Sequence, residues 1–120
     1  MRGVIIVVAS ADPTRFHAAL SLAAAHAALE RPARIFLQAE AVRLLKQPIA
    51  APGDPSYNEA GMPTLGQLLG EAAALGVEVV ACQSGLALAG LSATDLPPGV
   101  ETGGLVELLS KGGDDQLMMA

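Results

Sequence analysis

The sequence predicts an α/β domain built around a parallel sheet. Short apolar runs alternate with segments of helical periodicity five times along the 120 residues. The first run, 3–9, is continuously apolar rather than alternating, which is typical of a strand covered on both faces. This pattern predicts a doubly wound sheet with helices on both faces, and the length suits one domain spanning 1–120.

The first helix has a clear start signal. Asp12 is suited to cap it, and Pro13 to occupy its first position, where no N–H is needed. The alanine-rich segment that follows predicts a helix continuing to Leu29 and packing closely on the sheet. A second strand is predicted at 33–37 and a short helix at 40–46.

Residues 47–63 interrupt this rhythm. They hold four of the eight prolines and two of the 13 glycines, so we expect a long loop without helix or strand. A loop of this length is usually functional or disordered. The sequence leaves open whether it is a lid or partner-contact loop or a mobile insertion.

Helical spacing returns at 64–75, and Gly76 is expected to end that helix in the left-handed conformation. A β-branched strand at 77–81 follows. Glu107 and Lys111 have the i, i+4 spacing of an ion pair on a helix. The remaining predicted elements are a helical turn at 92–96, a brief strand at 100–102, a helix around 105–109 capped by Gly112, and an edge strand at 116–119.

The composition excludes several partners. Seven basic against twelve acidic residues give a net charge of −5, which argues against a nucleic-acid partner because no basic stripe exists. One cysteine cannot form an internal disulfide, which fits a reducing compartment. No signal peptide or membrane-spanning segment is recognised, so a cytoplasmic location is expected.

Familiar cofactor and metal motifs are missing from the sequence. It has no phosphate loop, no dinucleotide-binding fingerprint and no Cys-x-x-Cys pair. His17 and His26 are nine residues apart, which places them on opposite faces of one helix, since each residue turns about 100°. We therefore expect neither a metal site nor a cofactor.

Cys82 is the residue on which a functional prediction depends. It follows the strand 77–81 and precedes a short helical turn, a position where open α/β sheets bind ligands and where backbone N–H groups favour an anion. A helix N-terminus supplies only about 0.3–1 kcal/mol, so a dominant thiolate would also need a cation. No Lys, Arg or His lies between Lys46 and Lys111, so that cation must come from elsewhere in the fold or from another subunit. Alternatively, Cys82 packs as a small hydrophobe.

The residues around Cys82 also carry a family resemblance. The run 81–84 (ACQS), then Gly90-Leu91 and 95–104 (DLPPGVETGG), resembles the DsrE/DsrF-like family of small sulfur-relay proteins. That resemblance implies a three-layer, flavodoxin-like sheet ordered 2-1-3-4-5 and assembly into trimers or hexamers. It also implies a cysteine that carries sulfur as a persulfide between partner proteins, and only Cys82 can take that role here.

The leading hypothesis is therefore a sulfurtransferase-like carrier that takes sulfane sulfur on Cys82 from a donor protein and passes it to an acceptor. Ser84 and Gly85 would hold the charged sulfur, while Ser10 and Gln38, at the ends of the first two strands, are weaker candidates for the pocket rim. Two alternatives stay open. One is a non-catalytic, oligomeric module that binds a small ligand or partner; the other is a thiol redox sensor.

Overall fold

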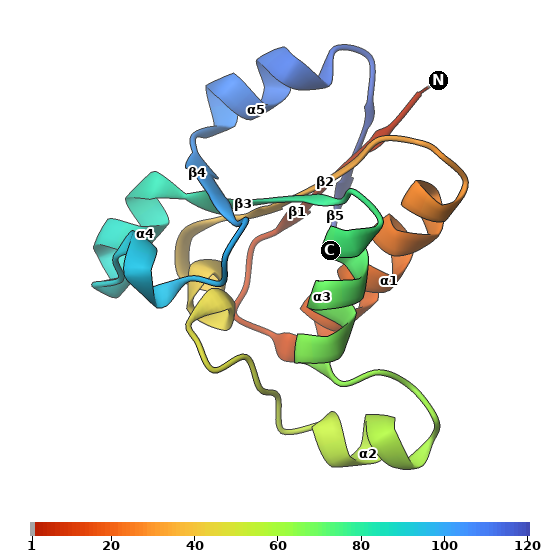
Figure 1. Cartoon of the computed structure of the whole chain (residues 1–120). Helices are drawn as coiled ribbons and strands as arrows, with labels where there is room; N and C mark the ends of the chain where they lie inside the picture. Colours follow the sequence, from red (N-terminus) through yellow and green to blue (C-terminus); the bar gives the residue numbers. More distant parts are fainter. Residues whose placement is uncertain (1) are drawn as a thin grey trace.

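The computed structural model describes residues 2–120 and confirms an α/β fold with a five-stranded, all-parallel sheet (Figure 1). The strands are β1 (Val4–Val8), β2 (Ala33–Leu37), β3 (Glu78–Cys82), β4 (Glu101–Gly103) and β5 (Gln116–Met119). The α-helices are α1 (Pro13–Ala28), α2 (Asp54–Glu59), α3 (Leu65–Ala74), α4 (Gln83–Ala89) and α5 (Leu105–Gly112), and two 3-10 helices are η1 (Ala39–Leu45) and η2 (Ala93–Asp95).

The strand order corrects one expectation. The sheet runs β4-β3-β2-β1-β5, so the expected order 2-1-3-4-5 is wrong: β2 lies between β1 and β3 instead of at an edge. The residues of β2 explain this position. Ile35, Phe36 and Leu37 are all buried, so both faces of the strand need cover, as in a central strand.

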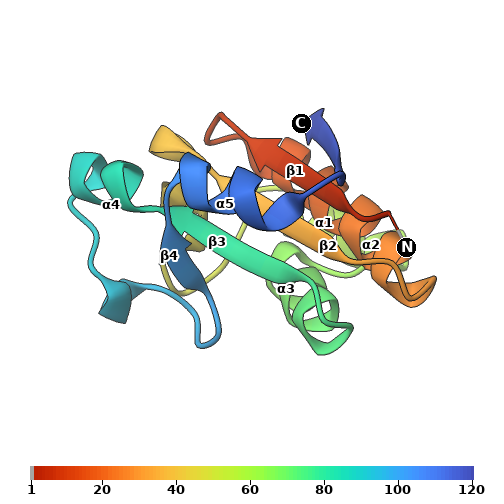
Figure 2. The same ribbon diagram turned by 90° about the horizontal axis from the view of Figure 1, so that it is seen from above.

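The order of the strands also explains which helix covers which face. The chain steps in one direction from β1 through β4, and right-handed crossovers then place α1 and α3 on the same face, where they pack against each other. The last connection returns across the sheet to β5, so α5 lies on the opposite face (Figures 1 and 2). Helices therefore cover both faces of the sheet.

The hydrophobic core is divided by the sheet. The larger part joins alternate strand residues, such as Ile6 and Ile35, to the apolar sides of α1 and α3. The smaller part, under α5, contains Ile5, Val7, Phe36, Val80 and Leu108. The eight-residue helix α5 thus covers part of this face of the sheet.

The segment 47–63 is more ordered than its prolines suggested. It contains α2, with Pro55 in the first turn, where its missing N–H is harmless, so the expectation that no helix would form is wrong. The Asp54 carboxylate accepts hydrogen bonds from the backbone N–H groups of Leu65 (3.0 Å) and Ala51 (2.9 Å). These bonds lower the pKa of Asp54, the Leu65 bond most strongly.

An aromatic pair also ties this segment to α1. The ring of Tyr57 stacks on His17, with 3.9 Å between ring centroids. His17 is buried, and its Nε2 lies 3.0 Å from the carbonyl oxygen of Pro63. These contacts tie α2 and the segment after it to α1.

The predicted helix ends are mostly confirmed. The Asp12 side chain accepts from the N–H groups of Thr14 and Arg15, and Gly76 has a φ of +95°. The last helix includes Gly112, so its cap is Gly113 rather than Gly112 as expected. Within residues 2–120, no helix has the length and apolar character needed to cross a membrane.

Candidate functional site: the Cys82 pocket

Cys82 is the last residue of β3 and the N-cap of α4. Its side chain is partly exposed, at the carboxyl end of the sheet. The Gly85 N–H donates a hydrogen bond to Sγ at 3.4 Å, so the sulfur satisfies one of the free N–H groups in the first turn of α4. The strand thus fixes the Cα position, and the helix start fixes the direction of the thiol.

Gly85 has a second role, which is steric. A Cβ added there would lie 2.5 Å from the carbonyl oxygen of Ala39 and 3.1 Å from its Cα. Ala39, the first residue of η1, has a φ of +50°, a left-handed conformation unfavourable for any residue other than glycine. The absence of a side chain at Gly85 therefore lets α4 and η1 meet at backbone distance beside the thiol.

The thiol opens into a small pocket of about 180 Å³. Three of the predicted residues, Gln38, Ser84 and Gly85, line it together with Cys82. Gln38 reaches it because β2 and β3 are paired in parallel and end at the same edge of the sheet. Ser10 is exposed after β1 and is not among the residues that line the pocket.

Sequence reasoning missed two further lining residues, Ala39 and Leu88. The side chain of Leu88 is 64% exposed, so it forms an apolar rim. The sequence offered little indication that Leu88 lines a pocket, because its pattern does not distinguish it from the other leucines of the short helices. Ala39 had no sequence signal, because its contact with Gly85 depends on how η1 and α4 are placed.

The pocket wall, as far as the described residues form it, carries no charged side chain. The sequence left open a cation from elsewhere in the fold, namely Arg15, His17, Arg43, Lys46 or Lys111, and none of these lines the pocket. His17 instead contacts Pro63, and Lys111 pairs with Glu107 at 3.3 Å, as predicted from their spacing. Within this chain, the thiol therefore faces amide, hydroxyl and aliphatic groups.

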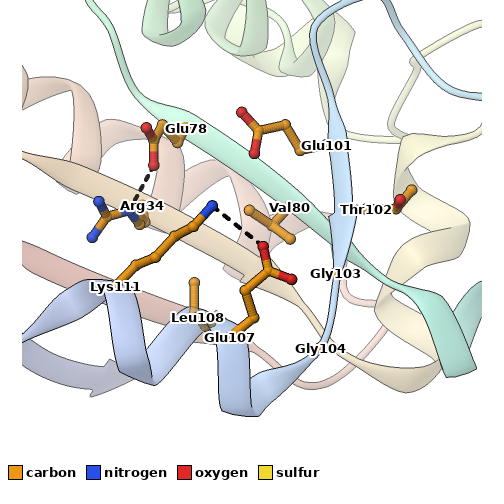
Figure 3. A pocket seen from close by; sticks show the side chains of 10 residues that line it. All are labelled: Arg34, Glu78, Val80, Glu101, Thr102, Gly103, Gly104, Glu107, Leu108 and Lys111. Carbon is orange, nitrogen blue, oxygen red and sulfur yellow. Dashed lines mark hydrogen bonds and ion pairs between the residues drawn. The ribbon is translucent and has the colours of Figure 1, made fainter.

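A second concavity lies between α5 and the strands β2, β3 and β4 (Figure 3). Its cations are already paired: Arg34 with Glu78 at 2.6 Å and Lys111 with Glu107 at 3.3 Å. Its free volume of about 20 Å³ is little more than one water molecule requires. The concavity is occupied by ion pairs and leaves little room for a ligand.

Residues 2–120 form no evident metal site. No group of three or more His, Cys, Asp or Glu side chains among them is placed to hold an ion. The chemistry available at the pocket is that of a partly exposed thiol, one backbone N–H donor, a carboxamide and a hydroxyl. Among these groups, the sulfur is the nucleophile once the thiol is ionised.

Comparison with known proteins agrees with this architecture. The chain belongs to the DsrE/DsrF-like family, whose model matches residues 2–116. The YchN protein from E. coli is similar over 100% of both chains, at 28% identity and a TM-score of 0.77. MTH1491 from Methanobacterium thermoautotrophicum, described as a protein of unknown function, shares the fold over 100% of both chains, at 18% identity and a TM-score of 0.70. No curated protein matches the chain.

Proposed function

We propose that this protein is a cytoplasmic sulfur carrier in which Cys82 holds sulfane sulfur as a persulfide and transfers it between partner proteins. One observation carries the proposal: the chain's single cysteine is partly exposed in a small pocket at the carboxyl edge of the sheet. Membership of the DsrE/DsrF-like family, which is associated in general with sulfur relay, supports it.

The transfer is redox-neutral and needs no cofactor. The Cys82 thiolate attacks the outer sulfur of a donor persulfide, the donor's S–S bond breaks, and the donor leaves as a thiolate. An acceptor thiolate then attacks the outer sulfur on Cys82, and Cys82 is released as a thiolate again. The pocket of about 180 Å³ has room for the added sulfur beside Ser84 and Gln38.

Mass spectrometry tests this proposal. The protein is incubated with thiosulfate, with polysulfide and with a persulfidated donor, and we expect a gain of one sulfur atom on the peptide that contains Cys82. The Cys82→Ser variant should gain none. If wild-type protein gains no sulfur under any of the three conditions, the carrier function is rejected.

A second function, a non-catalytic binding module, is favoured by one specific contact. Cys82 Sγ accepts the Gly85 N–H, so the cysteine also has a structural role as an N-cap. The rate of alkylation by iodoacetamide separates the two functions. A carrier thiol reacts in the native protein, whereas a packing cysteine reacts only after unfolding in urea.

We also propose that the protein is a homo-oligomer, a trimer or hexamer. Leu117 and Met119 of β5 pair in register with Ile5 and Val7 of β1, whose side chains lie under α5. The side chains of Leu117 and Met119 therefore project on the same side of the sheet as α5. Leu117 is 54% exposed and Met119 is 66% exposed. Together with α5 they form an apolar surface of the kind that marks an interface, made of Leu105, Val106, Leu109, Leu117 and Met119.

Light scattering after size-exclusion chromatography measures the oligomeric state. Val106, which is 85% exposed, should tolerate Glu in a folded monomer, so Val106→Glu is expected to lower the molecular mass to that of one chain. The matched control is Leu29→Glu at the end of α1, where leucine is 62% exposed but outside the proposed interface. A wild-type protein that elutes as a monomer rejects this proposal.

A further inference from the structure

A basic pocket lies at the opposite edge of the sheet from Cys82, where the strands begin. Its volume is about 250 Å³, and four separate parts of the chain supply its walls. The lining residues are Arg2, Gly3, His26, Arg31 and Gln116. Two of the chain's seven Lys and Arg residues and one of its two histidines therefore meet in one place, although the whole chain carries a net charge of −5.

The N–H donors of this pocket are largely unused. Within residues 2–120, the Arg31 side chain has no carboxylate partner, and Arg2 uses only Nε, which donates to the backbone oxygen of Asp114 at 2.9 Å. Among the described residues, the pocket thus offers two guanidinium groups without a carboxylate partner, and His26 forms part of its wall.

One nearby negative group, Asp115, is already engaged elsewhere. The Asp115 carboxylate accepts from the Gly3 N–H at 2.9 Å and from Arg34 at 3.3 Å. The last carbonyl groups of α1 would oppose an anion. However, those of His26 and Ala27 accept the N–H groups of Arg31 and Glu30, so they do not face the pocket as free acceptors.

We propose that this pocket binds a small tetrahedral oxyanion of the sulfate or phosphate class. Guanidinium groups recognise such anions with paired, charge-assisted hydrogen bonds, and two arginines converge here. The volume of about 250 Å³ lies below the range of about 300–1,000 Å³ typical of pockets for larger ligands, which favours an inorganic ion or a small phosphate ester. The site is independent of sulfur transfer at Cys82.

NMR titration of ¹⁵N-labelled protein tests the proposal with three probes: inorganic sulfate, inorganic phosphate and glycerol phosphate. Sodium chloride at matched ionic strength is the reference. We expect saturable shifts of the backbone signals of Gly3, Arg31 and Gln116 with at least one probe and none with chloride. Tighter binding of glycerol phosphate assigns the site to phosphate esters, and equal or tighter binding of the inorganic ions assigns it to free oxyanions.

The variants separate a site from general charge effects. Arg31→Gln removes one exposed guanidinium, and we expect the affinity to fall at least about tenfold, as for loss of a charge-assisted hydrogen bond. Arg15→Gln, at the other end of α1, is the matched control and should bind like the wild type. Shifts that do not saturate, that chloride reproduces, or that Arg31→Gln and Arg15→Gln change equally would overturn the proposal. Cys82→Ser should bind as the wild type does, which keeps this test separate from that of the carrier.

Discussion

Replacing Gly85 by alanine tests the geometry of the thiol pocket most directly. The added Cβ would lie 2.5 Å from the Ala39 carbonyl oxygen and 3.1 Å from both the Cα and the nitrogen of Ala39. All three atoms belong to the backbone, so no flexible side chain can move aside. Either α4 or η1 must shift by about an ångström to restore van der Waals contact.

The size of the effect follows from two opposing terms. Overpacking of this kind costs roughly 1–3 kcal/mol, and backbone contacts place Gly85→Ala at the upper end. Alanine in place of glycine favours the helix by at most about 1 kcal/mol. We therefore expect the free energy of unfolding to fall by about 1–2 kcal/mol, and the melting temperature to fall by roughly 4 °C for each kcal/mol.

Urea and thermal denaturation at one fixed protein concentration measure this change. Gly70→Ala in α3 is the matched control, since a Cβ there meets nothing within 4 Å and alanine should stabilise the helix. Movement of α4 away from η1 should also open the pocket and speed the alkylation of Cys82. If Gly85→Ala is as stable as Gly70→Ala, then the close approach of Ala39 and Gly85 does not exist.

Two further predictions concern other parts of the fold. Glu30 follows α1 with a φ of +61°, a left-handed conformation that glycine adopts without strain. Glu30→Gly should therefore raise the free energy of unfolding by about 0.5–1 kcal/mol. A decrease in stability to urea would contradict the left-handed conformation of this residue. Asp54 has a lowered pKa in the folded state because it accepts backbone bonds from Leu65 and Ala51. A carboxyl group with a lower pKa when folded stabilises the protein above its unfolded pKa, and this contribution is lost as the pH falls through the folded pKa. The difference in melting temperature between wild type and Asp54→Ala should thus be constant near neutral pH and shrink in acid; a difference that stays constant or grows on acidification would refute this role.

Local patterns were enough to predict much of this protein. The continuous apolar character of β1 and the Asp12-Pro13 start of α1 act within a few residues, so the sequence shows them directly. The same holds for Cys82, Ser84 and Gly85, which lie within one strand end and one helical turn. Gln38 could be proposed as well, because parallel strands end at one edge of the sheet.

Predictions failed where distant residues decide the outcome. The prolines of 47–63 suggested a bare loop, but Asp54 bonds to Leu65, eleven residues away, and His17 stacks on Tyr57 from another helix. The strand order was taken from a family resemblance, and the sequence of β2, which carries Arg34 among its apolar residues, does not say whether that strand is central or at an edge. The contact between Ala39 and Gly85 has no local signature at all.

The sequence by itself determined the class of fold, the places where strands and helices begin, and the single thiol at the end of a strand, because hydrophobic periodicity and capping act over a few residues. Only the tertiary structure decided that β2 is central, that α5 packs on the opposite face from α1 and α3, and that Arg2, Arg31 and His26 share a pocket. These features depend on how the crossovers close the sheet, which joins residues far apart in the chain and leaves no trace in any short stretch of it.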